Sequence, residues 1–152
     1  MRLGGIYALE GVMNTSEQYH QPVLEALSAF VRDRTATVKG DLPWPATDIQ
    51  AALTVIGRRA AIGTGVPNLE NAHIPKANLS AANLNYADLT GANLNYADLT
   101  GARLTGAELI VTHLKYANLT AGDNLTQAAD LTHADLVGAD LSNIDHAGDV
   151  FS

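Results

Sequence analysis

Five histidines are the residues best suited to metal binding or acid–base chemistry in this chain, but their spacing supports neither. The sequence contains no HxxxH or HExxH pattern, which would place two imidazoles on one face of a helix. The serines and threonines recur at repetitive positions without a base and a group to orient it, so they form no nucleophilic constellation. We therefore expect a non-enzymatic protein with no cofactor and no metal site, whose histidines lie at the surface: His20, His73, His113, His133 and His146.

The composition excludes further kinds of functional site. There are no cysteines, which excludes a disulfide framework, cysteine-ligated zinc and a cysteine nucleophile. The net charge of −7 argues against direct nucleic-acid binding, which needs clustered Lys and Arg. Residues 1–66 hold six acids and six bases, whereas residues 123–152 hold six acids and neither Lys nor Arg. Most of the net charge therefore belongs to the C-terminal part.

Four of the C-terminal acids recur at intervals of five residues. At that spacing their carboxylates should diverge around the tip of the protein, so we expect no shared Ca²⁺ or Mg²⁺ site. The acidic surface serves either solubility or the docking of a basic protein partner. Its residues are Asp130, Asp135, Asp140 and Asp145.

A five-residue period positions these side chains. From Pro67 onward Leu or Ile recurs every five residues, usually with Ala two positions before it, and the block Ala82–Gly91 is repeated identically as Ala92–Gly101. Neither an α-helix, with a period of 3.6, nor a plain strand, with a period of 2, produces this pattern. The apolar positions, called i below, are Leu69, Ile74, Leu79, Leu84, Leu89, Leu94, Leu99, Leu104, Leu109, Leu114 and Leu119.

The pattern A-(N/D)-L-x-x resembles the pentapeptide-repeat family over residues 67–148. The resemblance implies a β-solenoid: a right-handed, four-sided β-helix with one pentapeptide per side, here of about four coils. The residue chemistry agrees, because positions i−2 and i of an extended side face the axis while i−1 and i+1 face water. Gly at i+2 suits the corners. Residues one coil apart should stack, so Tyr96 and Tyr116 should stack on the outside.

The period breaks once, because Leu119 and Leu131 lie twelve residues apart rather than ten. We interpret residues 122–128 as one side enlarged to seven residues, either a tolerated loop or a recognition feature. In this register Asp130 follows Asp88 and Glu108 on one side of the rod.

Residues 1–66 lack the period and are predicted to form a small α-helical region that precedes the solenoid domain, residues 67–152. We expect one helix from Leu3 and a second from Pro22, at its first position. A third begins at a capping box of Thr47 and Gln50 and is closed by Arg58 and Arg59.

Both ends of a β-helix expose unpaired backbone groups unless something covers them. The helices and Trp44 are available to cover the N-terminal edge. The C-terminal edge is expected either to be closed by Phe151 or to be buried against a second copy. Such an end-to-end homodimer should tighten as salt screens its acids.

No targeting or membrane-spanning segment is predicted, since Glu10 interrupts the first apolar run, and we expect a cytoplasmic protein. The strings RLGGIYALE and TDIQAALTVIGRR also resemble a segment upstream of the repeats in some bacterial members. A membrane-anchoring region can precede that segment, and a longer native form carrying one would associate with the membrane.

The resemblance implies two functions. The first is a rigid binding or scaffold module for protein–protein interaction. The alternative is topoisomerase protection by DNA mimicry, which needs a long acidic face at phosphate-like spacing. We favour the binding module, because the rod is short and His73, Asn93 and His113 interrupt the side next to the acids.

Overall fold

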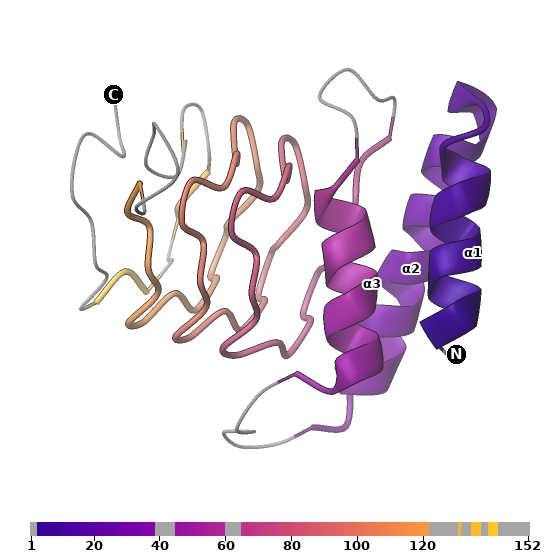
Figure 1. Ribbon diagram of the computed structural model, residues 1–152. Coiled ribbons are helices and arrows are strands. Elements are labelled where there is room, and N and C mark those ends of the chain that lie inside the picture. Colours follow the sequence, from indigo (N-terminus) through magenta and orange to yellow (C-terminus); the bar gives the residue numbers. More distant parts are fainter. Residues whose placement is uncertain are drawn as a thin grey trace.

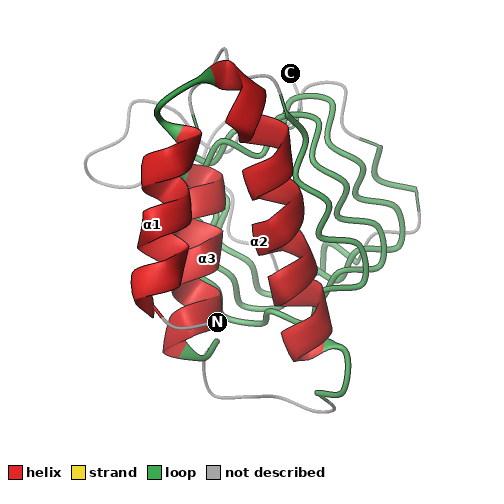
Figure 2. Cartoon of the chain, turned by 90° about the vertical axis from the view of Figure 1, so that its right-hand side faces the viewer, coloured by secondary structure: helices red, strands yellow, loops and turns green. Residues whose placement is uncertain are grey.

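The computed structural model describes residues 3–38, 45–59, 65–121, 131, 135–137 and 140–142. Its helices come first: α1 (Leu3–Met13), the short 3₁₀ helix η1 (Glu17–Tyr19), α2 (His20–Thr35) and α3 (Thr47–Gly57). The coils follow and stack away from the helices (Figure 1). Seen from the helical end, α1 lies outermost with α3 behind it, and α2 lies beside them (Figure 2). Helix α2 also contacts the first coil directly, because Thr35 bonds to His73.

The three helices share one apolar core with the coils. Helix α1 buries only part of its surface, chiefly through Ile6 and Met13. Helix α3 lies in the middle of the stack, so most of its side chains are enclosed. Its buried residues are Ile49, Ala51, Ala52, Leu53, Val55 and Ile56. None of the helices within the described ranges combines the length and the hydropathy that a membrane crossing requires.

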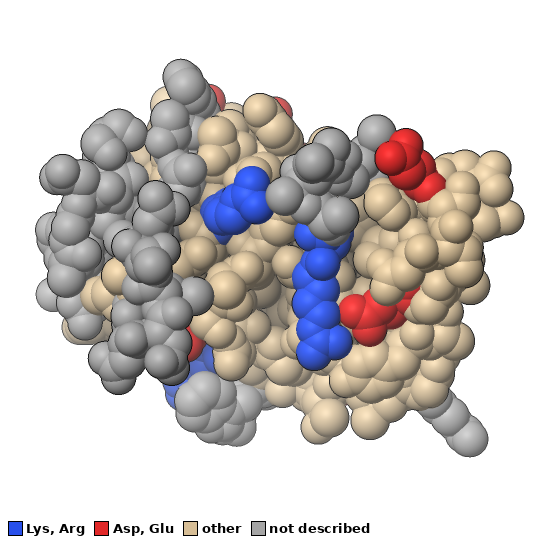
Figure 3. Space-filling model, turned by 45° about the horizontal axis from the view of Figure 1, so that its top comes forward, with Lys and Arg blue, Asp and Glu red and all other residues tan. Residues whose placement is uncertain are grey.

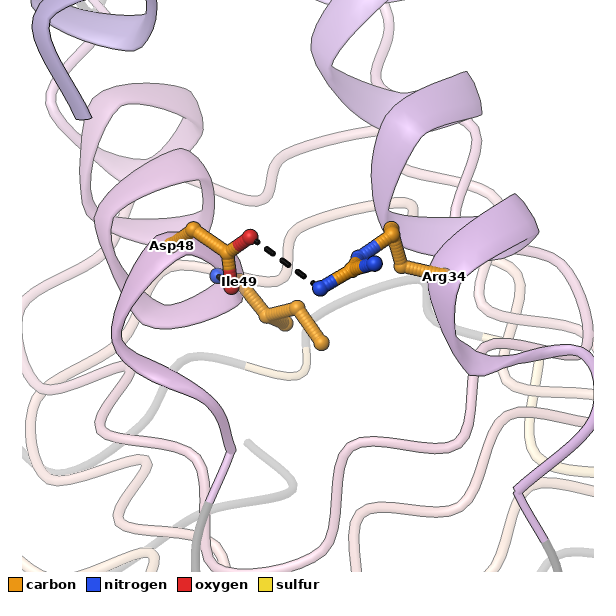
Figure 4. Close-up of polar contacts among 3 residues, drawn as sticks. All are labelled: Arg34, Asp48 and Ile49. Carbon is orange, nitrogen blue, oxygen red and sulfur yellow. Dashed lines mark hydrogen bonds and ion pairs between the residues drawn. The ribbon is translucent and has the colours of Figure 1, made fainter. Parts of the chain in front are cut away.

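Two details of the helix starts differ from the prediction. Helix α2 begins at His20, two residues before Pro22. The capping box is wrong, because Thr47 is already the first helical residue and Ala46 precedes it as N-cap. The neighbouring Asp48 accepts a hydrogen bond from the N–H of Ile49 (2.9 Å) and pairs with Arg34 of α2 (3.4 Å; Figure 4). The first turn of α3 is thus joined to α2 by an ion pair.

As far as residue 118, each coil pairs with the next through parallel bridges between residues 20 apart in the chain. For example, the N–H of Leu69 donates to the carbonyl of Asp88 (2.8 Å), and the N–H of Asp88 donates to the carbonyl of Pro67 (3.0 Å). Within the described coils each side contributes an isolated bridge rather than a strand of several residues. The hydrogen bonds between these pairs thus show directly that one coil contains 20 residues.

Tight turns separate the sides. The N–H at i−2 of one pentapeptide donates to the carbonyl at i of the one before, as Ala72 does to Leu69 (3.0 Å). The third residue of each turn has φ between +49° and +66°, as a type II turn requires. The glycines predicted at corners adopt this conformation, and other side chains share it. These residues are Asn71, Lys76, Ala81, Tyr86, Gly91, Tyr96, Gly101, Gly106, Val111 and Tyr116.

The axis of the solenoid is filled as the period predicts. Every Leu or Ile at position i from Leu69 to Leu119 is at most 2% exposed, and the alanines at i−2 are buried beside them. Thr112 replaces Ala at one of these positions and is also fully buried. Its Oγ1 donates to the carbonyl of Leu89 (2.8 Å), so the extra polar atom is satisfied within the core.

The register beyond the irregular segment differs from the prediction. Glu108 bridges Asp135, a step of 27 residues from 108 to 135, and His113 bridges Asp140. The N–H of Leu109 donates to the carbonyl of Asp135 (2.8 Å), which fixes this pairing. The placement of Asp130 beside Glu108 was therefore wrong, because one further pentapeptide separates the paired coils. The predicted insertion at 122–128 itself lies outside the described residues.

The helical region supplies the hydrogen bonds that a preceding coil would supply. Between stacked coils the N–H at i−1 donates to a carbonyl of the coil before, as Asn93 does to Ala72 (2.9 Å). The first coil has helices in place of that neighbour. The substitute acceptors are Oγ1 of Thr35 for the N–H of His73 (3.1 Å), Oε1 of Gln50 for Asn78 (2.9 Å) and the carbonyl of Gly57 for Asn83 (2.8 Å). Trp44, expected to help here, lies outside the described residues.

Candidate functional site

Arg59 lies nearly enclosed between the end of α3 and the first coil, at 9% exposure. Its Nε donates to the carbonyl of Asn83 (3.0 Å), and its Nη1 and Nη2 donate to the carbonyls of Gly65 and Asn85. Burial, and to a lesser extent the nearby charge of Arg103, lowers the pKa of Arg59. The prediction gave Arg59 only the closing of a helix. Its guanidinium instead binds the first coil to the helices.

The Asn and Asp side chains at i−1 fold back onto the chain instead of only facing water. Oδ1 of Asp88 accepts a hydrogen bond from the N–H of Thr90 (3.0 Å), two residues on. This Asx turn satisfies a backbone donor that the bridges leave over. The same contact recurs at Asn68, Asn78, Asn83, Asn93, Asp98, Asn118, Asp135 and Asp140. Most Asn and Asp of the repeat thus have a structural role.

At two positions where i−1 is not Asn or Asp, an Asn side chain one coil earlier serves the same donor. After Arg103 and His113, the N–H groups of Thr105 and Lys115 donate to Oδ1 of Asn85 (3.0 Å) and of Asn95 (2.9 Å), one coil earlier. After His73 the corresponding residue is Pro75, which has no N–H. The side chains of Arg103, His73 and His113 are therefore not needed for an Asx turn.

Two of the four predicted partner-binding acids are described. Asp135 and Asp140 are exposed and lie on adjacent sides of the coil. Hydrogen bonds from the side chain and the backbone N–H of Ser142 lower the pKa of Asp140. Asp130 and Asp145 lie outside the described residues.

Asp135 completes a column of acids along one side of the rod. It bridges Glu108, which in turn bridges Asp88, and each stands one coil from the next. All three residues are exposed or half-buried. The described acids therefore run along one side of the rod, and Asp140 lies on the next side. We call Asp88, Glu108 and Asp135 the acidic column.

The next side carries aromatic and basic groups. The rings of Tyr96 and Tyr116 stack with centroids 4.8 Å apart and planes 14° apart, which confirms the predicted stack. Lys76 Nζ lies 5.9 Å from the centroid of Tyr96, and Lys115 Nζ lies 5.3 Å from that of Tyr116, both within cation–π range. The side next to the acidic column thus carries stacked tyrosines and lysines.

The predicted surface histidines His73 and His113 also lie on this second side, separated by Asn93. The amide nitrogen of Asn93 is 3.4 Å from Nδ1 of His73. Within the described part of the chain, no three His, Asp or Glu side chains gather as a metal site would require. The histidines His133 and His146 lie outside it.

Basic side chains also gather where the helices meet the coils, over α3 and the first coils (Figure 3). Arg58, Arg59 and Arg103 belong to this junction. Arg58 is paired with Glu10 of α1 (3.5 Å) and is otherwise exposed. The sequence alone did not predict that these three residues are neighbours. Arg58 and Arg59 end a predicted helix, whereas Arg103 belongs to the five-residue repeat.

A groove of about 290 Å³ lies between α3 and the first coil. Its hydroxyls are already engaged: Ser80 Oγ donates to Oδ1 of Asn78 (2.8 Å), and Thr54 Oγ1 donates to the carbonyl of Gln50 (2.9 Å). The described residues that line the groove include no imidazole and no carboxylate. Among these described residues none is a usual general base.

Comparison with known proteins agrees with this geometry. The family model described as "Pentapeptide repeats (8 copies)" matches residues 68–101, 92–123 and 124–145, slightly more than half of the chain. No curated protein matches the sequence.

Several solved structures are similar. HetL, a pentapeptide repeat protein involved in heterocyst differentiation regulation from the cyanobacterium Nostoc sp., is 30% identical, with a TM-score of 0.47; the match covers 59% of this chain and 41% of HetL. Rfr23 from the cyanobacterium Cyanothece is 27% identical (TM-score 0.30; 62% and 66% covered). A pentapeptide repeat protein from the Arabidopsis thaliana thylakoid lumen is 25% identical (TM-score 0.29; 49% and 53%). The chain thus spans less than half of HetL.

Proposed function

Because the chain belongs to the pentapeptide-repeat family, whose members fold as right-handed four-sided β-helices, we propose that it is a rigid binding module for a basic protein partner. Proteins of this family are generally non-enzymatic structural or interaction proteins. The proposal includes a cytoplasmic location and a role in which the coils hold a fixed pattern of side chains against the partner.

The acidic column carries the proposal. Its three carboxylates repeat at the coil spacing of about 4.8 Å, and backbone bridges hold their positions. The adjacent side carries Lys76 and Lys115 together with Asp140, so it is less acidic than the column and would hold a basic partner less well if that partner docked out of place. Charge complementarity of this kind gives orientation and fast association more than raw affinity.

The test removes the charges of the column and keeps its shape. The triple variant Asp88→Asn, Glu108→Gln, Asp135→Asn keeps one acceptor oxygen on each side chain, so the Asx turns of Asp88 and Asp135 can persist. The matched control changes three exposed acids of the helical region: Glu17→Gln, Glu25→Gln and Asp33→Asn. Both variants lose the same charge, and only the first alters the column.

Proteins from the source cells would be crosslinked to the wild type and to each variant and quantified by mass spectrometry. We expect a basic protein that is captured by the wild type and the control and is lost with the column variant. In calorimetry the purified partner should then bind the wild type and the control variant with similar affinity, and the column variant more weakly. Capture that both variants lose equally, or a partner that is not basic, would contradict the proposal.

DNA mimicry is the second candidate, because the acids Asp88, Glu108 and Asp135 repeat along one side of the rod. The described column is nevertheless short, and Lys76 and Lys115 on the next side weaken a DNA-like field. A supercoiling assay with DNA gyrase separates the two functions. Inhibition by the wild type and not by the column variant would support mimicry over the binding module.

A further inference from the structure

Helix α1 turns an uncharged face to the outside of the molecule. Its one charged residue, Glu10, is directed to Arg58 (3.5 Å), and the Glu10 side chain is only 19% exposed. Leu3, Tyr7 and Val12 are 41%, 48% and 43% exposed. Large apolar side chains exposed together on one helix, with no charge between them, are typical of a contact surface.

Helix α2, next to α1, has a charged, solvent-exposed face and serves for comparison. Helices α1 and α2 lie side by side at the outer end (Figure 2). The exposed positions of α2 include Glu25, Asp33 and Arg34. An amphipathic helix on the surface normally has such charges opposite its buried stripe. Helix α1 lacks them, so its outer face is the exception.

The centre of the α1 surface allows close approach of another backbone. Gly4, Ala8 and Gly11 are spaced by four and three residues and so form one stripe along the helix. A Cβ placed on Gly4 or Gly11 would meet no atom within 4 Å. Beside this stripe a groove of about 340 Å³, lined in part by Leu3, Tyr7, Pro45 and Ala51, continues the surface toward α3. The space suits an approaching helix.

We propose that this α1 face (Leu3, Gly4, Tyr7, Ala8, Gly11 and Val12) binds the same face of a second copy, which forms a two-fold symmetric homodimer. A two-fold interface brings one patch against itself, and a patch without charge can do so without repulsion. This dimer uses the helical end of the molecule and is independent of the function proposed for the coils.

The charge distribution of the chain selects a second copy as the occupant. The net charge is −7, and six acids without a compensating Lys or Arg follow residue 122. The coil that contains residues 135–137 lies at the end remote from α1 (Figure 1). Contact between two α1 faces therefore keeps the acidic ends of the copies apart. Contact through the C-terminal coils would bring them together.

A membrane surface fits the same face less well. Helices that lie in a bilayer interface are usually rich in Lys and Arg on their polar side, and residues 3–13 contain neither. The overall negative charge also opposes approach to anionic lipids.

Sedimentation velocity over about 1–100 µM tests the dimer with a matched pair of substitutions. Ala8→Glu places a carboxylate at the centre of the α1 face, and Ala26→Glu makes the same change at an exposed alanine of α2. We expect the wild type and Ala26→Glu to dimerise alike. Ala8→Glu should raise the dissociation constant about a hundredfold or more, because the charge enters the interface twice.

Gly11→Leu is a second variant that adds bulk without charge and raises helix propensity, so loss of the dimer cannot be attributed to unfolding. We expect it to weaken the dimer, with a thermal midpoint in circular dichroism that is no lower than that of the wild type. The wild-type dissociation constant should change little between about 50 and about 500 mM salt, because the interface holds no ion pairs.

Three outcomes would overturn the proposal. The first is a wild type that stays monomeric over the whole concentration range. The second is a dimer that survives Ala8→Glu and Gly11→Leu but is lost with Val137→Glu in the C-terminal coil. The third is a monomer that binds neutral phosphatidylcholine vesicles through the α1 face and is released by Ala8→Glu.

Discussion

Arg59 and Asn83 exchange hydrogen bonds across the junction between α3 and the first coil. Nε of Arg59 donates to the carbonyl of Asn83 (3.0 Å), and Nδ2 of Asn83 donates to the carbonyl of Arg59 (3.4 Å). Both residues are buried, at 9% and 5% exposure. Each side chain satisfies a backbone oxygen of the other, so the pair ties the helical region to the solenoid as one unit.

Replacement of Arg59 should weaken this junction strongly. Arg59→Met would leave three carbonyl oxygens without their donor, at about 1–3 kcal/mol for each that stays buried. We expect urea unfolding to show a loss of roughly 3 kcal/mol or more. The exposed neighbour provides the control, since Arg58→Met should change the free energy of unfolding by at most about 0.5–1 kcal/mol. Equal effects of the two would refute the proposed role of Arg59.

Substitutions at Leu99 and Asp98 test the inward register. Leu99 is fully buried, so Leu99→Ala should cost roughly 2–5 kcal/mol. Asp98 accepts hydrogen bonds from the N–H and the hydroxyl of Thr100. Asp98→Ala should therefore cost about 1 kcal/mol, and Asp98→Asn less, because the amide oxygen can still accept. Similar losses at both positions in chemical denaturation would contradict the register.

Val111 is expected to be a site of backbone strain. It adopts φ of +49°, a left-handed conformation that a β-branched residue rarely takes, and it is 48% exposed. Val111→Asn should raise the free energy of unfolding by about 1 kcal/mol, since Asn tolerates this conformation. Val66→Asn removes a valine of similar exposure (44%) and serves as the control. Stabilisation by both substitutions would point to exposed hydrophobicity rather than to strain.

Two buried hydroxyls of α2 should respond in opposite directions. Thr35 Oγ1 donates to the carbonyl of Val31 (2.9 Å) and accepts from the N–H of His73, whereas Ser28 Oγ is buried without a hydrogen-bond partner. Thr35→Val should destabilise the protein by about 1–3 kcal/mol, because it orphans a buried N–H. Ser28→Ala should be neutral or should stabilise by up to about 1 kcal/mol. Thermal unfolding that reverses this order would contradict both assignments.

The five-residue period predicted which side chains face inward, and the family resemblance that this period carries implied the solenoid. The period was not enough to predict the register beyond Leu119. A shift by one pentapeptide leaves every leucine facing the axis, so only the backbone pairing of Glu108 with Asp135 reveals it. The acidic column was therefore misassigned to Asp130, although its chemistry was anticipated.

The junction was missed for a different reason. Nothing in the spacing of Arg59 distinguishes it from Arg58, and only the fold shows that one is enclosed and the other exposed. The Asx turns, in contrast, had a visible signal. Asn or Asp stands at i−1 in most repeats, and a residue that only faces water would not need so narrow a choice.

The substitution of helices for a missing coil gives the molecule a direction of growth. A ribosome releases α1, α2 and α3 first, and they present Thr35, Gln50 and Gly57 as a ready template for residues 73, 78 and 83. Each finished coil then offers the same row of acceptors to the next, 20 residues later in the regular coils and 27 residues later from Glu108 to Asp135. No distant segments have to meet, so the rod can extend vectorially from its seed as it is synthesised.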